Sequence, residues 1–309
     1  MIATAVQSNL VCLTQPVPSE RAGFGGASDR RFSLSLIDTM ANLALPRKAP
    51  NIGECIYCGS TKNNLSKEHA IPYGLNGPWT LLRASCSRCA DITHRFERDT
   101  LRSLLWPVRT VLALQTRRPT LRPKSLPLEL ESGGVYRTIH LPLNEYPLYL
   151  PTPLFAQPGY LAGDSMSPQV TPELRFLHLA GPSLADVVQR HTADFAGARL
   201  NFSPQDFART LAKIAFTAAV YVLGLAPFTT TPIRRIILGQ DKSVSHWVGS
   251  WIGETVNEPK GLNAMKIRAS GTDIHVVLRL FAQFGAPEYH VVLGTAAPEY
   301  SNSAAWPWK

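Results

Sequence analysis

Two cysteine pairs constrain this chain more than any other feature. Cys55-x-x-Cys58 and Cys86-x-x-Cys89 can each direct two thiolates at one point, and together they complete the tetrahedral set that a structural Zn²⁺ requires. The spacer between the pairs, from Gly59 to Ser85, is longer than the roughly 15–20 residues of a simple zinc ribbon. We therefore expect a zinc site, with further functional residues inside the spacer.

Disulfide bonds or a redox pair are the alternative uses of these four thiols. Cys12 is the only other cysteine among 309 residues, and a chain of this size does not need disulfides for stability. The first residues also lack the basic region, apolar stretch and cleavage site of a signal peptide. These observations favour a cytoplasmic protein that keeps its thiols for metal.

The length and hydropathy of the chain indicate a globular protein of about two domains. Its longest apolar stretch, residues 214–228, is too short and too rich in alanine to span a bilayer, so we expect a buried helix there and no membrane association. A helix should begin at Ser203-Pro204, where serine can cap and proline fits the first turn, and should end at Gly224.

Positive charge is concentrated directly after the second cysteine pair. Between Arg83 and Lys124 the chain carries ten basic and three acidic residues, whereas the formal charge of the whole chain is +9. A local basic excess attracts phosphates and drives counterion release when nucleic acid binds. We therefore expect DNA as the partner, with Arg88, Arg95, Arg98 and Arg102 as the nucleic-acid-binding residues, although a solvated arginine-rich helix would look the same.

Four segments follow from the distribution of turn formers, prolines and periodic apolar residues. Residues 1–50 should be loosely ordered, with a short helix near residues 35–43. Residues 51–116 form the cysteine module, with strands near residues 65–71 and 79–84 and a helix from Ser87 that kinks or ends at Trp106-Pro107. Residues 117–134 read as a proline-rich linker. Residues 135–309 should form an α+β domain, with strands at residues 135–141, 274–281 and 289–293 and a helix near residues 232–238.

The cysteine module resembles the zinc-stapled HNH endonucleases. The resemblance covers about 40 residues and rests on three elements that agree: both cysteine pairs, the run Lys67-Glu68-His69-Ala70-Ile71-Pro72, and the glycine turn at Gly74. It implies a ββα-metal fold, in which a β-hairpin followed by a helix holds one divalent ion. The fold class expected for the whole chain is therefore α+β, a small ββα-metal zinc module followed by a larger α+β domain.

The resemblance also implies roles for individual residues. His69 would be the general base that takes a proton from the attacking water, and Glu68 would bind or orient a catalytic Mg²⁺ or Mn²⁺. An imidazole titrates near neutral pH and carboxylate oxygens suit a hard cation, so the residue types fit these roles.

Two positions depart from the family pattern. An asparagine often follows the last cysteine as a metal ligand, but here that position is Ala90, and the middle asparagine of the family falls on Leu81. His94, and after it Asp91, are the substitute ligands that we expect, because helical spacing places both near the hairpin. Ion pairing of Asp91 and Glu97 with Arg95 or Arg98 is the alternative.

The sequence thus favours a metal-dependent HNH-type endonuclease that hydrolyses phosphodiester bonds in DNA. The main alternative is a zinc-stapled nucleic-acid-binding protein whose active site has degenerated and does not cleave. A third possibility is that the cysteine module only supports a larger domain of another function.

Overall fold

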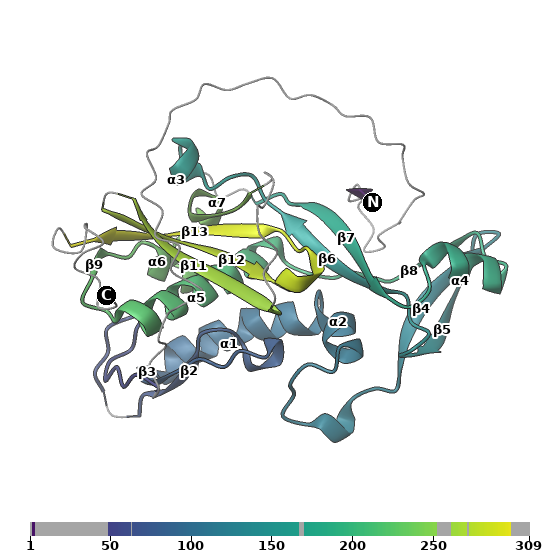
Figure 1. Ribbon diagram of the computed structural model, residues 1–309, viewed down its shortest axis with the longest axis horizontal. Helices are drawn as coiled ribbons and strands as arrows, with labels where there is room; N and C mark the ends of the chain where they lie inside the picture. Colours follow the sequence, from purple (N-terminus) through teal and green to yellow (C-terminus); the bar gives the residue numbers. More distant parts are fainter. Residues whose placement is uncertain are drawn as a thin grey trace.

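The largest sheet is antiparallel and lies in the second half of the chain (Figure 1). The computed structural model describes residues 2–3, 49–62, 64–166, 170–251, 261–270 and 272–297. The strand order is β10-β13-β12-β11, and β9 pairs with β13. The five strands are β9 (Phe228–Thr230), β10 (Val248–Trp251), β11 (Asn263–Ser270), β12 (Asp273–Leu280) and β13 (Glu288–Ala296). The strands expected at residues 274–281 and 289–293 are thus confirmed as β12 and β13.

Helix α5 (Pro204–Leu223) lies between this sheet and helix α1 (Ser87–Arg102) (Figure 1). The Ser203 side chain accepts a hydrogen bond from the Asp206 backbone N–H, and Gly224 ends the helix with a positive φ of 74°. Most α5 side chains are buried because the helix is covered on both sides. The predicted capping serine, final glycine and buried character of this helix are therefore confirmed.

A hairpin and a helix follow each other in the cysteine-bearing segment. The elements are β2 (Ser66–His69), the 3₁₀ turn η1 (Tyr73–Leu75), β3 (Thr80–Ser85), α1 (Ser87–Arg102) and α2 (Trp106–Val111). Strands β2 and β3 pair antiparallel, with Glu68 opposite Leu81 and His69 opposite Thr80. Pro107 has no N–H to bond the carbonyl of Ser103, which explains why α1 ends at Arg102. The strand–strand–helix order expected here is present.

Part of the segment expected to be a linker is a strand instead. After η2 (Pro119–Leu121), β4 (Ser125–Ser132) pairs with β5 (Val135–Pro142) on one side and with β8 (Phe195–Gly197) on the other. Leu126, Leu128 and Leu130 are buried at alternate positions, a strand pattern that the prolines obscured. Pro127 is tolerated because β8 pairs only from Glu129 onward, so one side of the strand at Pro127 has no partner strand.

The remaining elements connect these parts. Strand β7 (Glu173–Ala180) lies between β1 (Ile2–Ala3) and β6 (Leu148–Leu154), and α4 (Leu184–His191) lies beside β8. The short helices are α3 (Gly159–Ala162), α6 (Ile233–Ile237), α7 (Val244–Trp247) and the 3₁₀ turn η3 (Ala282–Phe284). Helix α6 confirms the helix expected near residues 232–238. The helix expected near residues 35–43, and Cys12, lie outside the described residues.

The buried apolar side chains form one continuous cluster. It runs from Cys55 and Leu81 in the cysteine segment, through Phe96 on α1 and Phe216 on α5, to Val291 on β13. Within the described ranges, no helix combines the length and the apolar character that crossing a membrane requires. The cysteine segment is therefore packed directly against the second half of the chain.

Candidate functional site

The four cysteines come from a tight loop and from the beginning of α1. The Cys55 carbonyl accepts a hydrogen bond from the Gly59 N–H at 2.8 Å, and the Cys55 N–H donates to the Ser60 carbonyl at 2.8 Å. Gly59 has a φ of +72°, which favours glycine and closes the turn. Cys86 occupies the N-cap position of α1 and Cys89 lies in its first turn, near the positive end of the helix dipole.

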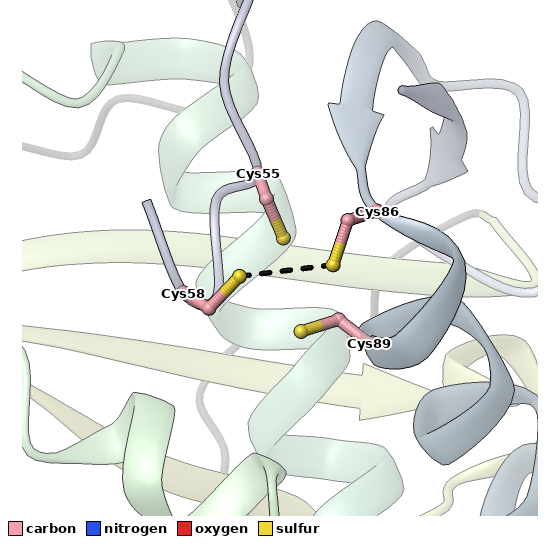
Figure 2. Close-up of side chains that lie close together, drawn as sticks. All are labelled: Cys55, Cys58, Cys86 and Cys89. Atoms are coloured by element: carbon pink, nitrogen blue, oxygen red, sulfur yellow. Dashed lines mark hydrogen bonds between the residues drawn. The ribbon is translucent and has the colours of Figure 1, made fainter. Parts of the chain in front are cut away.

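The four sulfur atoms converge on one point (Figure 2). All four lie within 4.8 Å of one another, and Cys58 Sγ is 3.7 Å from Cys86 Sγ. A tetrahedral zinc with Zn–S bonds of about 2.3 Å separates its sulfurs by about 3.8 Å. The thiols are free rather than joined as disulfides. The cysteine cluster can therefore hold a metal ion, and its all-sulfur donor set and spacing are compatible with zinc.

His69 ends strand β2 at the edge of an open cleft. Its Nδ1 lies 3.2 Å from Thr80 Oγ1 on β3, and its ring is 6.2 Å from the ring of Tyr73. Burial, followed by the positive charges of Lys213 and Lys67, lowers the pKa of His69 below its ordinary value of 6.5. The imidazole is therefore neutral at pH 7 and able to accept a proton.

Glu68 is buried, and its carboxylate pairs with Lys213 although the residue also contributes to the lining of the cleft. Its Oε1 lies 2.8 Å from Nζ of Lys213 on α5, and the same Nζ lies 2.8 Å from Oε1 of Glu97 on α1. The Glu97 contact is an ion pair. Burial acts to lower the pKa of Lys213, but the two carboxylates outweigh it and the net pKa is raised. Burial raises the pKa of Glu97, against the opposing charge of Lys213.

The cleft has a volume of about 830 Å³ and lies between the hairpin, α1 and the residues after α2. Of the four arginines predicted to bind nucleic acid, Arg95, Arg98 and Arg102 of α1 line the cleft and Arg88 does not. Lys67, Arg117 and Arg118 also line it and are exposed. The acidic side chains in the lining are Glu68, Asp91 and Glu97. Seven basic side chains line the cleft against these three acidic ones, and Lys213 offsets one further negative charge, so the cleft carries an excess of positive charge.

Two other arginines of the basic segment are engaged in holding the fold. Arg109 donates from Nε to the Gly74 carbonyl at 2.8 Å and from Nη1 to the Leu101 carbonyl at 3.0 Å. A Cβ at Gly74 would lie 2.5 Å from the Arg109 guanidinium, so glycine is required for this close approach. Arg122 donates to the Leu114 carbonyl at 2.6 Å. These guanidiniums are less available to phosphates than the exposed ones.

The expected ligands of a catalytic ion do not share one point in this structure. Glu68, Asp91 and His94 all line the cleft, but within the described ranges the four cysteines are the one set of three or more Cys, His, Asp or Glu side chains close enough to share an ion. Asp91 and His94 are exposed on α1, and Ala90 is buried beneath them. Binding of Mg²⁺ or Mn²⁺ by these residues stays a prediction.

Sequence reasoning missed Lys213 and Thr80. A lysine inside an otherwise apolar helix is itself a signal, because a fully buried ammonium needs a partner of opposite charge. Thr80 carried no comparable signal, since its importance comes only from its place opposite His69 in the hairpin.

Comparisons of this chain with protein-family models, with curated proteins and with solved structures found no match.

Proposed function

We propose that this protein is a metal-dependent HNH-type endonuclease that hydrolyses phosphodiester bonds in DNA, with His69 as the general base. The observation that carries the proposal is the position of His69 at the edge of a cleft lined by exposed lysine and arginine side chains. Such a cleft favours a polyanion, and an imidazole beside a bound phosphate can activate water.

Thr80 supports this role for His69. If Nδ1–H of His69 donates to Thr80 Oγ1, then Nε2 carries a lone pair and can take the proton from water as its oxygen attacks phosphorus. The P–O bond to the leaving oxygen then breaks. Lys67, Arg95 and Arg102 would hold the flanking phosphates and stabilise the developing negative charge.

A bound Mg²⁺ or Mn²⁺ would polarise the scissile phosphate and stabilise the leaving oxygen. Asp91 and His94 are the side chains on this wall of the cleft best suited to hold it, because Glu68 is already paired with Lys213. Mg²⁺ commonly uses only one or two carboxylates together with waters and substrate phosphates, so a sparse protein ligand set is compatible with binding in the presence of DNA.

A second candidate is a zinc-stapled DNA-binding protein that does not cleave. The observation that favours it is the engagement of Glu68 with Lys213, combined with alanine rather than asparagine at position 90. In that case the cysteine cluster and the basic cleft would persist without a catalytic ion.

Nicking of supercoiled plasmid in Mg²⁺, Mn²⁺ or Ca²⁺ separates the two functions. The endonuclease cuts with Mg²⁺ or Mn²⁺, and His69→Ala loses at least a hundredfold in rate while keeping its zinc and its circular dichroism spectrum. His140→Ala, which changes an exposed histidine on β5, is the matched control and cuts normally. DNA binding without cutting by the wild type in any metal would establish the second candidate.

A further inference from the structure

Helix α5 presents a polar stripe to the cysteine segment. Thr210, Lys213, Thr217 and Tyr221 recur at three- and four-residue steps and therefore share one face of the helix. Thr210 Oγ1 lies 3.1 Å from Thr100 Oγ1 on α1, Thr217 Oγ1 lies 3.2 Å from the Tyr57 hydroxyl, and the Tyr221 ring stacks on Trp79 at 5.7 Å. These polar contacts therefore fix both the rotation of α5 about its axis and its position along the cysteine segment.

Lys213 is the charged member of the stripe and is completely buried, with a relative exposure of 0%. Its ammonium has three donors, and three oxygen atoms surround it: the Glu68 carboxylate, the Glu97 carboxylate and the backbone carbonyl of His69. One side chain from the second half of the chain therefore contacts β2 twice and α1 once.

The placement of these contacts matters because neighbouring residues of a strand point to opposite faces. The buried Glu68 side chain contacts Lys213, the neighbouring His69 side chain is less buried, and both residues contribute to the lining of the cleft. The bond from Lys213 to the His69 carbonyl also holds the backbone of β2 at His69 itself. Rotation of β2 that moved the imidazole would break both contacts and leave a buried charge unpaired, which is strongly unfavourable.

We infer that Lys213 is a positioning residue, which holds the strand that carries His69 at a fixed orientation and distance from the cleft. This inference rests on the proposed function for its catalytic consequence, although the mechanical role stands on the contacts alone. It assigns the second half of the chain a direct part in building the active site, through α5.

The test compares Lys213→Met, which keeps an unbranched side chain one atom shorter and removes the ammonium, with Lys242→Met, which changes an exposed lysine. Hydrogen exchange is measured peptide by peptide, together with kcat and KM for plasmid nicking. In Lys213→Met we expect faster exchange confined to residues 66–71 and a loss in kcat of tenfold or more with KM changed less than twofold, because small misplacement of a catalytic group costs up to about 100-fold. Lys242→Met should match the wild type in both measurements.

Exchange at residues 66–71 that equals the wild type would overturn the inference, and so would a uniform increase across the chain. If the wild type cuts DNA in no metal, the proposed function fails, while the exchange pattern still decides the positioning role. Should Lys213→Met fail to fold, the triple variant Lys213→Met, Glu68→Met, Glu97→Met removes all three charges together, which proteins commonly tolerate. That variant should fold yet still exchange faster at residues 66–71; unchanged exchange there would contradict the inference.

Discussion

His69 and Thr80 stand opposite each other in the β2–β3 hairpin, and their side chains meet at 3.2 Å. The contact is local, because the turn between the strands brings the two residues together. The direction of the hydrogen bond decides which ring nitrogen of His69 is free to accept a proton. A threonine hydroxyl can accept from Nδ1–H, which selects the tautomer that a general base needs.

Thr80→Val should reduce kcat of DNA cleavage about fivefold to tenfold and leave KM nearly unchanged. Valine keeps the shape of threonine and removes the hydroxyl, so the tautomer of His69 loses a hydrogen bond worth about 1 kcal/mol. Steady-state nicking kinetics in Mg²⁺ measure the effect, and Thr80→Ser, which keeps a hydroxyl, should remain close to the wild type. Equal rates for Thr80→Val and the wild type would show that Thr80 does not orient the imidazole.

Cys89→Ser should remove the bound metal and destabilise the fold. Structural zinc contributes on the order of 10 kcal/mol to small modules, and the cluster here connects the loop at Cys55 to the first turn of α1. We expect the zinc content to fall from about one ion per chain to near zero, with a lower melting temperature, by elemental analysis and thermal unfolding. Cys12→Ser tests the general effect of losing a thiol and should retain the ion; equal zinc content in both variants would exclude the cluster as the metal site.

The local parts of this architecture follow from the sequence. Two cysteine pairs, a glycine after Cys58 and a helix after Cys86 are sufficient to predict the thiol cluster, because each depends on neighbouring residues. The cap at Ser203 and the end of α5 at Gly224 are equally local. The prolines at positions 119, 123 and 127 misled the prediction of a linker, since the buried alternation of the β4 leucines outweighs Pro127.

The tertiary contacts of the site could not be predicted in the same way. The motif alone predicts Glu68 as a ligand of a catalytic ion, whereas the ion-pair partner of Glu68, Lys213, lies far away in the sequence. Arg117 and Arg118 reach the cleft only because the chain turns back after α2. Pairing over such separations depends on how α5 packs on α1, which neither periodicity nor motif spacing specifies.

Arg95→Ala combined with Arg102→Ala should weaken DNA binding and reduce its dependence on salt. Both guanidiniums line the cleft from α1 and are exposed. For every phosphate that is no longer neutralised, the slope of log K against log salt concentration should become shallower by about 0.9. Fluorescence anisotropy with a labelled duplex, in the His69→Ala background so that the DNA stays intact, measures both quantities.

A charge-matched control distinguishes the cleft from general electrostatic attraction. Arg175 on β7 and Arg190 on α4 are outside the cleft lining, so their double alanine variant removes the same charge elsewhere. This control variant should keep a slope of log K against log salt concentration close to that of the wild type. An equal decrease in affinity in both double variants would mean that DNA binds through net charge and not through this cleft.

The free energy of unfolding should depend on pH through His275, a histidine on β12 that is 7% exposed. Burial, with the nearby His290 and Arg268, lowers its pKa from 6.5 to about 4. Between those pH values the unfolded chain binds a proton that the folded protein does not, so stability falls as the pH drops from about 6.5 to about 4, by about 3 kcal/mol in total. Urea unfolding of His275→Gln across this range should have a flatter pH profile, whereas His140→Gln should follow the wild type; parallel profiles for all three proteins would contradict the assignment.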